Sequence, residues 1–298
     1  MELALLTGSN GFLGKYIQKC LKNHYHVSTL SRKTGNYQIY LEQQVPTFVE
    51  EFNFVVHAAG KAHCIPKTES EKQEFYLTNI IGTQNLLEGL SKTSVPKYFV
   101  FISSVSVYGQ EFGSNIDENN DLAAVDPYGI SKVAAEQLVS DWCNSNNVVC
   151  SILRLPLIVG SNPPGNLGAL IKGLQKGYYF NIAGGKARKS MVLAEDVANS
   201  IINIAKIGGI YNLTDGYHPS LAELSEYISV KLGKGKPMFM PMWLARIIAN
   251  FGDLLGSNAP LNTNKLKKIT SDLTFDDSKA REVFGWNPKP VLDGFNIK

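Results

Sequence analysis

The chain has 298 residues and a formal net charge of +3, from 29 Lys and Arg against 26 Asp and Glu. Hydrophobic residues make up 44% and charged residues 18% of the sequence, which excludes a disordered chain and allows one large or two modest domains. So small a positive excess does not predict nucleic-acid or membrane-surface binding, and the basic cluster at Lys265, Lys267 and Lys268 is typical of a solvated helix face.

The sequence contains no feature that suggests export, a membrane span or a metal site. The N-terminus has no secretory signal, because no basic region precedes its short apolar run. The apolar stretch at 238–255 is interrupted and falls short of the ~20 residues that a membrane span needs. The cysteines form no C-x-x-C pair and no Cys-His pair at metal-ligand spacing, so we expect reduced thiols, a cytoplasmic location and no metal site: Cys20, Cys64, Cys143 and Cys150.

Short apolar runs alternate with helical windows along the first half of the chain. Strands are expected at 3–7, 26–30, 54–57, 98–103 and 148–153 and helices at about 12–22, 69–90 and 128–144. Repeated strand–helix–strand units predict an α/β fold, a Rossmann-type doubly wound parallel sheet with helices on both faces. We expect this first domain to cover residues 1–160.

The rhythm of the sequence changes after about residue 160, where an Asn-Pro-Pro-Gly segment breaks the chain. A helix at 193–207 and a strand at 209–213 are expected to complete the sheet layer, so that parts of 190–215 belong to it. The rest of 161–298 is expected to form a smaller C-terminal lobe with amphipathic helices at 221–232 and 243–255. The second helix could lie on a membrane surface, but it lacks a Lys- and Arg-rich polar face, which favours packing against the domain.

A glycine-rich turn follows the first expected strand directly. Gly8 permits a tight turn, Gly11 lets the main chain approach a pyrophosphate, and Gly14 lets the next helix pack closely on the strand. The start of that helix, at Phe12 and Leu13, offers free N–H groups and a partial positive charge to an anion. The position of this turn within a strand–helix–strand unit predicts a dinucleotide-binding site.

The end of the second expected strand bears on which dinucleotide binds. The glycine spacing is Gly-x-x-Gly-x-x-Gly, and Ser31, Arg32 and Lys33 stand where a carboxylate would bind the ribose hydroxyls of NAD. Ser31 and Arg32 could hold a 2′-phosphate instead, which favours NADP(H) over NAD(H). In the alternative interpretation, Arg32 lies along the adenine and tolerates either cofactor.

A tyrosine and a lysine with helical spacing suggest proton transfer. Tyr128 and Lys132 lie four residues apart, on one face of the helix expected at 128–144. A free tyrosine has a pKa near ~10, so acid/base work at neutral pH needs about 4 kcal/mol of phenolate stabilisation, which the Lys132 ammonium and an oxidised nicotinamide ring would supply. Alone, this spacing is more typical of surface packing. Ser104, 24 residues before Tyr128, ends a buried strand, where open parallel sheets carry active sites.

Together these segments resemble the extended short-chain dehydrogenase/reductase family, in its NAD-dependent epimerase/dehydratase branch of nucleotide-sugar 4-epimerases and 4-ketoreductases. The likeness covers essentially the whole chain and is carried by TGSNGFLG at 7–14, VVHAAG at 55–60, SSVSVYG at 103–109, YGISK at 128–132 and DDSKAREVFGWNP at 276–288. The resemblance implies catalytic roles for Ser104, Tyr128 and Lys132. It implies dinucleotide contacts from Tyr128, Lys132 and a further set: Ala58, Ala59, Gly60, Asn79 and Pro156.

The resemblance also narrows the reaction. Sugar-nucleotide 4,6-dehydratases carry Thr-Asp-Glu where this chain has Ser104-Val105-Ser106, and 3,5-epimerase/reductases need a cysteine that is missing between 64 and 143. The reaction that remains is hydride transfer at C4 of a hexose that is linked to a nucleotide, which is taken to be UDP. The short chain and Arg32 favour reduction of a 4-keto-6-deoxy sugar in surface-polysaccharide synthesis. A UDP-hexose 4-epimerase with tightly bound NAD is the alternative.

For the substrate, the resemblance points to Ser104 and Ser106 in the first domain and to two segments of the smaller lobe, which would bind it. Asn166 and the basic turn at 184–190 would contact the nucleotide diphosphate. The family has an arginine at the position of Lys189, so either Lys189 or the neighbouring Arg188 could bind, or both could be solvated turn residues.

Two rival classes are disfavoured, and one association is expected. A non-catalytic dinucleotide-binding sensor would not need the intact Ser-Tyr-Lys set, and a reductase of flavonoid or steroid carbonyls would not need the basic turn. His57 is expected to be a buried strand residue and not a base. By resemblance, a homodimer would form through the helices expected at 69–90 and 128–144.

Overall fold

The computed structural model describes residues 1–62, 66, 68–256 and 259–295. Cys64, expected to be a reduced thiol, lies outside the described residues. Seven parallel strands form one sheet in the order β11-β7-β5-β4-β1-β2-β3. These strands are β1 (Leu3–Thr7), β2 (His26–Ser31), β3 (Tyr37–Gln38), β4 (Phe54–His57), β5 (Tyr98–Ser104), β7 (Val149–Leu155) and β11 (Gly209–Asn212).

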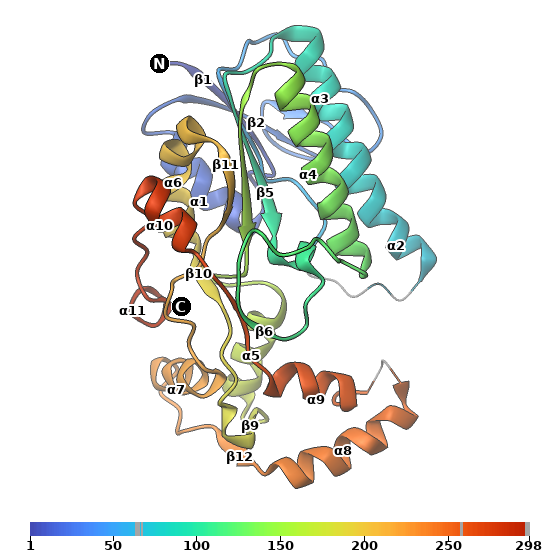
Figure 1. The fold of residues 1–298 in the computed structure, drawn as a ribbon, viewed down its shortest axis with the longest axis vertical. Helices are drawn as coiled ribbons and strands as arrows, with labels where there is room; N and C mark the ends of the chain where they lie inside the picture. Colours follow the sequence, from blue (N-terminus) through green and yellow to red (C-terminus); the bar gives the residue numbers. More distant parts are fainter. Residues whose placement is uncertain (63–65, 67, 257–258, 296–298) are drawn as a thin grey trace.

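Helices cover both faces of this sheet, as Figure 1 shows. On one face α1 (Phe12–Leu21) packs against α6 (Ala194–Ile207). The other face carries α3 (Gly82–Thr93) and α4 (Pro127–Ser145). Successive strand side chains point to opposite faces, so Leu6 joins the core under α1 and α6, and Leu5 joins the core under α3 and α4. The expected doubly wound α/β fold is confirmed.

The helix expected at 69–90 is one helical run with an irregular centre. It consists of α2 (Glu69–Phe75), a π-helical segment at Tyr76–Ile81, and α3. Such π segments frequently occur at functional sites. This one contains Asn79, whose side chain is buried.

The start of α4 is fixed by local sequence. The Asp126 carboxylate accepts hydrogen bonds from the N–H groups of Tyr128 and Gly129, and Pro127 occupies the first helical position. Tyr128 therefore lies in a first turn whose conformation is held by a cap.

Three pairs of short parallel strands lie outside the large sheet. They are β8 (Leu157–Val159) with β10 (Met191–Leu193), β6 (Gly113–Ile116) with β13 (Leu273–Phe275), and β9 (Phe180–Ile182) with β12 (Met238–Met240). Of the segment expected to complete the sheet layer, β11 joins the large sheet but β10 does not, because it pairs with β8 after the chain has left the sheet at Pro156.

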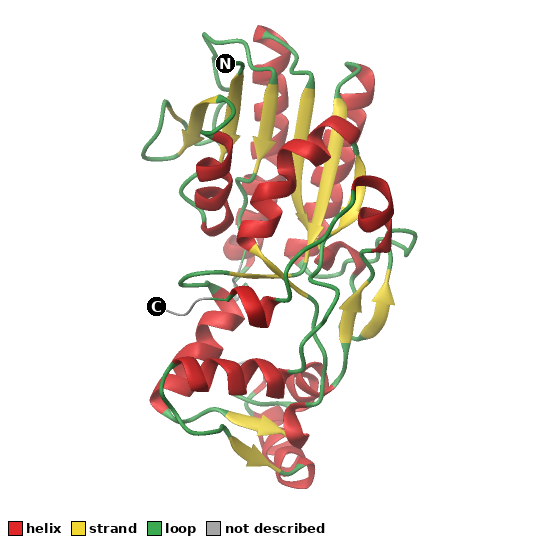
Figure 2. Ribbon diagram, turned by 90° about the vertical axis from the view of Figure 1, so that its left-hand side faces the viewer, coloured by secondary structure: helices red, strands yellow, loops and turns green. Residues whose placement is uncertain are grey.

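Helix α10 (Ser278–Phe284) packs beside α6 and β11, whereas a further group of helices lies beyond the ends of the strands (Figures 1 and 2). We use "C-terminal lobe" for α5 (Gly165–Lys176), α7 (Leu221–Lys231), α8 (Met242–Leu254) and α9 (Thr263–Thr270) with β9 and β12. Helix α8 buries Ala245, Ala249 and Gly252, and its first residue, Met242, packs against the same cluster, so the expectation that it packs against the domain holds for one of its sides. Within the described ranges, the helices all lack the length and hydropathy of a membrane span.

Candidate active site

The glycine turn between β1 and α1 is built for close backbone contact. Gly8 has a φ of +73°, and a Cβ there would lie 2.6 Å from backbone atoms of Ala58 and Ala59. A Cβ on Gly14 would lie 2.0 Å from the Gly8 carbonyl oxygen, so both positions exclude any side chain. The first turn of α1 has neither a side-chain cap nor an acidic residue, and the N–H groups at Phe12, Leu13 and Gly14 therefore fit a pyrophosphate.

A buried hydrogen-bonded chain joins the ends of β1 and β4 beside this turn. The His57 ring nitrogens lie 2.6 Å from the Thr7 hydroxyl (Nδ1) and 2.9 Å from the Thr83 hydroxyl (Nε2), and the Thr7 hydroxyl accepts the Ala59 N–H. Burial, assisted by the charge of Lys132, lowers the pKa of His57 to about 3. His57 is therefore a neutral structural residue, and the prediction that it is not a base is confirmed.

Asn79 and Lys132 meet at Gly60. The Asn79 side-chain oxygen accepts the Lys61 N–H at 2.7 Å, and its nitrogen donates to the Lys61 carbonyl and to Ser131. A Cβ built on Gly60 would lie 3.1 Å from Asn79 Oδ1 and 3.4 Å from Lys132 Nζ. The structure thus brings together residues from three distant motifs at the carboxyl ends of the strands, where ligands bind open sheets.

Lys132 is held by the strand beneath it. Its ammonium donates to the Ile102 carbonyl at 2.8 Å and lies 4.6 Å from the centre of the Phe101 ring. Burial lowers the pKa of Lys132 to about 8, although the nearby Glu136 carboxylate favours the charged form. The ammonium is therefore close to its titration range at neutral pH.

Tyr128 and Ser104 form the reactive pair of the site. Ser104 is the neighbour that lowers the pKa of the Tyr128 hydroxyl, but burial is the larger cause and raises the pKa above that of free tyrosine. The Ser106 hydroxyl lies 3.1 Å from that of Ser104. The expectation that Lys132 acidifies the phenol is not met by the protein's own groups, because the ammonium is directed to the Ile102 carbonyl.

At the adenosine end, the half-exposed Arg32 side chain is paired within the protein. Its guanidinium forms an ion pair with Glu42 at 2.9 Å and donates to Thr78, while the Ser31 hydroxyl donates to the Thr34 carbonyl. A carboxylate thus does lie near the end of β2, and it comes from Glu42. The sequence analysis missed Glu42 because it lies ten residues beyond Arg32, in a segment without periodicity.

The predicted diphosphate contacts are also engaged elsewhere. The Lys189 ammonium donates to the carbonyls of Lys268 and Ser271, and burial lowers its pKa. Arg188 donates to the His218 carbonyl at 2.9 Å and lies 3.8 Å from the Glu223 carboxylate. Both predicted contacts are thus paired within the protein, and their binding of a diphosphate stays a prediction. Asn166 is exposed in the first turn of α5.

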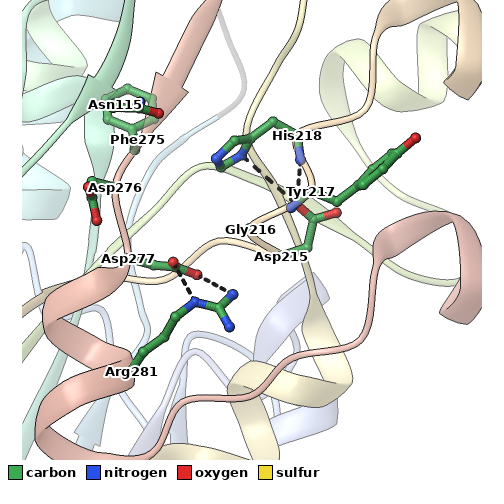
Figure 3. A pocket seen from close by; sticks show the side chains of 9 residues that line it. All are labelled: Asn115, Asp215, Gly216, Tyr217, His218, Phe275, Asp276, Asp277 and Arg281. Atoms are coloured by element: carbon green, nitrogen blue, oxygen red, sulfur yellow. Dashed lines mark hydrogen bonds and ion pairs between the residues drawn. The ribbon is translucent and has the colours of Figure 1, made fainter.

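Two hollows in the structure lie apart from these residues. Figure 3 shows one of about 460 Å³, in which Asp277 pairs with Arg281 at 2.8 Å and Asp215 accepts the N–H groups of Tyr217 and His218. Its charged groups thus hold the C-terminal segment onto the loop after β11. The second hollow, of about 610 Å³, is lined by Phe12 and Tyr16 of α1, whose rings contact each other, and by residues 159–162.

The fold and this site define a Rossmann-type dinucleotide-binding protein with a Ser-Tyr-Lys set at the ends of its strands. The chain belongs to the NAD dependent epimerase/dehydratase family, whose model matches residues 4–213. Members of this family are enzymes.

Individual relatives span nearly the whole chain. A UDP-glucose 4-epimerase of Vibrio cholerae is 27% identical and is matched over 98% of this chain and 92% of its own. A decarboxylating sterol-4-alpha-carboxylate 3-dehydrogenase of Dictyostelium discoideum is 30% identical over 97% of both chains.

Solved structures share the fold at lower identity. A UDP-glucuronic acid 4-epimerase of Bacillus cereus, in complex with UDP-glucuronic acid and NAD, has a TM-score of 0.75 at 19% identity, covering 98% of this chain and 96% of its own. RMD of Pseudomonas aeruginosa, complexed with NADPH, has a TM-score of 0.72 at 20% identity, covering 98% and 95%.

Proposed function

We propose that the protein transfers hydride at C4 of a nucleotide-linked hexose, and that 4-epimerisation of a UDP-hexose is its reaction. The observation that carries this proposal is that Ser104, at the end of β5, is the neighbour that lowers the pKa of Tyr128, while Lys132 of the same helix as Tyr128 is held on that strand at the Ile102 carbonyl. The relative named UDP-glucose 4-epimerase supports the substrate class, because it is matched over nearly all of both chains.

Each step of the proposed reaction can be assigned to residues of the chain. N–H groups at the start of α1 would hold the pyrophosphate of NAD, and Lys132 and Asn79 border the place of the nicotinamide ribose. When bound, NAD supplies a hydride acceptor and a positive charge. Tyr128 accepts the proton of the sugar 4-hydroxyl and later returns it, while the Ser104 hydroxyl orients that oxygen. Because burial raises the pKa of Tyr128, the phenolate needs the added positive charge of the oxidised cofactor.

The pairing of Arg32 with Glu42 supports NAD over NADP(H). A guanidinium already matched to a carboxylate at 2.9 Å offers less to a 2′-phosphate, and Glu42 could accept hydrogen bonds from ribose hydroxyls. Both cofactors occur among proteins of this fold, since the epimerase of B. cereus was solved with NAD and RMD with NADPH.

Reduction of a 4-keto-6-deoxy sugar for surface polysaccharide remains the second candidate. The observation that favours it is the position of Ser31 and Arg32 at the end of β2, from which Arg32 could release Glu42 and turn to a phosphate. A sterol-type substrate has support from the 30% identical dehydrogenase, and the engaged Lys189 removes one reason for disfavouring it. A non-catalytic sensor has no support from the site, because Ser104, Tyr128 and Lys132 are all in place.

Location and association are part of the same proposal. We place the reaction in the cytoplasm, and three cysteines in the described part of the chain are free thiols. The homodimer expected through the helices at 69–90 and 128–144 is supported by exposed apolar side chains in the π-helical segment, Tyr76 and Leu77, and in α4, Ile130.

The test is to denature the purified protein, quantify the released dinucleotide, and incubate the native protein with UDP-glucose or UDP-N-acetylglucosamine under NMR. Stoichiometric NAD and interconversion of C4 epimers are the expected results. An empty protein that consumes NADPH only with a 4-keto sugar would establish the reductase instead. A protein that does neither, and is not stabilised by any nucleoside diphosphate in a thermal shift, would refute a nucleotide-sugar substrate.

A further inference from the structure

Helix α8 presents its most apolar side to solvent. Trp243, Ile247, Phe251 and Leu254 are 64, 46, 68 and 83% exposed, and their spacing of four, four and three residues places them on one stripe of the helix. We call these four residues the outer stripe. The buried side of the same helix is made of small residues, Ala245, Ala249 and Gly252. This arrangement inverts the usual pattern, in which the large apolar residues of a surface helix face the core.

Two further exposed apolar residues lie in the segment that leads into α8. Met238 and Phe239 of β12 are 50 and 61% exposed and precede α8 by a few residues. Figure 1 places α8 at the outer end of the molecule, with α9 between it and the strands of the large sheet. Contiguous exposed apolar area of this kind marks an interaction surface, whereas single exposed apolar residues need no explanation.

The segment that contains this stripe has a net positive charge. Residues 231–255 contain Lys231, Lys234, Lys236 and Arg246 against the single acid Asp253, a net charge of +3, which equals the net charge of the entire chain. The Asp253 carboxylate is already occupied by the N–H and hydroxyl of Thr263. Lys236 is 3.3 Å from Glu226 of α7, and this pair is exposed and therefore weak.

We propose that the outer stripe docks on an anionic phospholipid bilayer, with α8 lying in the plane of the interface. The two large aromatic side chains, Trp243 and Phe251, suit the headgroup boundary, and the basic residues before and within α8 suit acidic headgroups. The polar face of α8 itself is poor in lysine and arginine, but the fold supplies basic groups from the loop before β12. This proposal does not depend on the proposed function.

The charge distribution favours a bilayer over a second copy of the chain. Two copies related by a twofold axis through α8 would bring the same basic residues of both copies close together. Like charges at an interface are unfavourable. The exposed apolar residues Tyr76 and Leu77 of the π-helical segment and Ile130 of α4 offer a separate face for a homodimer. The outer stripe is therefore not needed for self-association.

The test is flotation of the full-length protein with vesicles of phosphatidylcholine alone or with about one third phosphatidylglycerol, at low and physiological ionic strength. We expect the protein to float with the anionic vesicles and less at higher salt. Trp243→Glu/Phe251→Glu should reduce the floated fraction at least about tenfold, because charged side chains cannot enter the headgroup boundary. Lys234→Gln/Arg246→Gln should lower the preference for anionic vesicles.

The matched control is Val49→Glu/Val283→Glu, which alters two exposed apolar residues outside the C-terminal lobe and should float like the native protein. Far-UV circular dichroism and thermal unfolding establish that each variant is folded. The proposal is overturned if the native protein stays unbound with both vesicle types, or if the Trp243/Phe251 variant floats unchanged. It is equally overturned by light scattering that shows an oligomer dissociated by that variant while the native protein does not float.

Discussion

The large sheet with its helices and the C-terminal lobe place their polar and apolar groups in opposite ways. In the sheet region, charged and polar side chains are buried and paired: Arg154 and Glu136, at 3 and 4% exposure, form an ion pair of 2.8 Å that also binds Ser103 and Tyr108. In the C-terminal lobe, ion pairs are exposed and large apolar residues of α8 face solvent. The first arrangement fixes geometry for catalysis, and the second leaves a surface free for a partner.

The two regions should differ most in the unfolding free energy that is lost when an ion pair is broken. Glu136→Gln leaves the Arg154 guanidinium buried without a counter-charge and should lower the free energy of unfolding by about 3–5 kcal/mol. Glu226→Gln, which removes the exposed partner of Lys236 in the lobe, should change it by less than about 1 kcal/mol. Urea unfolding of both variants measures the difference, and equal losses would contradict the contrast between the two regions.

Alanine substitutions at two glycines compare how tightly the backbone is packed in the two regions. Gly14→Ala would place a Cβ 2.0 Å from the Gly8 carbonyl oxygen, so we expect a loss of about 3 kcal/mol and much weaker NAD binding. Gly235→Ala, in the lobe, meets nothing within 4 Å and should stay within about 0.5 kcal/mol of the native protein. Thermal unfolding and NAD titration measure both. Retained NAD affinity in Gly14→Ala would show that the turn does not hold the dinucleotide.

Acid should destabilise the sheet region through His57. Its pKa is about 3 in the folded protein and near 6.5 when unfolded, so between these values the unfolded chain binds more protons. The contribution is complete above pH 6.5 and is lost as the pH falls, by about 2 kcal/mol between pH 6.5 and 5. His57→Gln should flatten this dependence, and the exposed His24→Gln should not. Identical slopes in all three proteins would show that His57 is not buried in its neutral form.

The smallest predicted effect concerns the attachment of the C-terminal segment. The Trp286 ring nitrogen donates to the Thr214 carbonyl at 2.9 Å, and Trp286→Phe removes this hydrogen bond while keeping an aromatic ring. We expect a loss of about 1 kcal/mol in unfolding free energy, with NAD binding unchanged. A change in NAD affinity would show that this segment is coupled to the dinucleotide site.

The sequence predicted those features that local pattern determines. The strand at Leu3–Thr7, the glycine turn and the helix that begins at Phe12 follow one another in the chain, so apolar periodicity and glycine spacing were sufficient. The set of Ser104, Tyr128 and Lys132 was found because a strand end and a helix start are both readable from sequence.

Other features depend on contacts between distant residues. The pairing of β6 with β13 joins segments about 160 residues apart, and the ion pair of Arg32 with Glu42 and the capture of Lys189 by two carbonyls depend on loop conformation. Neither periodicity nor spacing records such contacts. The sequence left a membrane-surface position for 243–255 open but favoured packing, since an apolar face in sequence does not say whether another element covers it.

The central claim is that the Tyr128 hydroxyl moves the proton during hydride transfer. The most direct measurement is turnover of UDP-hexose by Tyr128→Phe, with NAD binding followed in parallel and the exposed Tyr178→Phe as control. We predict a loss of turnover of about 10²–10⁴-fold with NAD affinity nearly unchanged, and native behaviour in the control. Native turnover in Tyr128→Phe would contradict the claim.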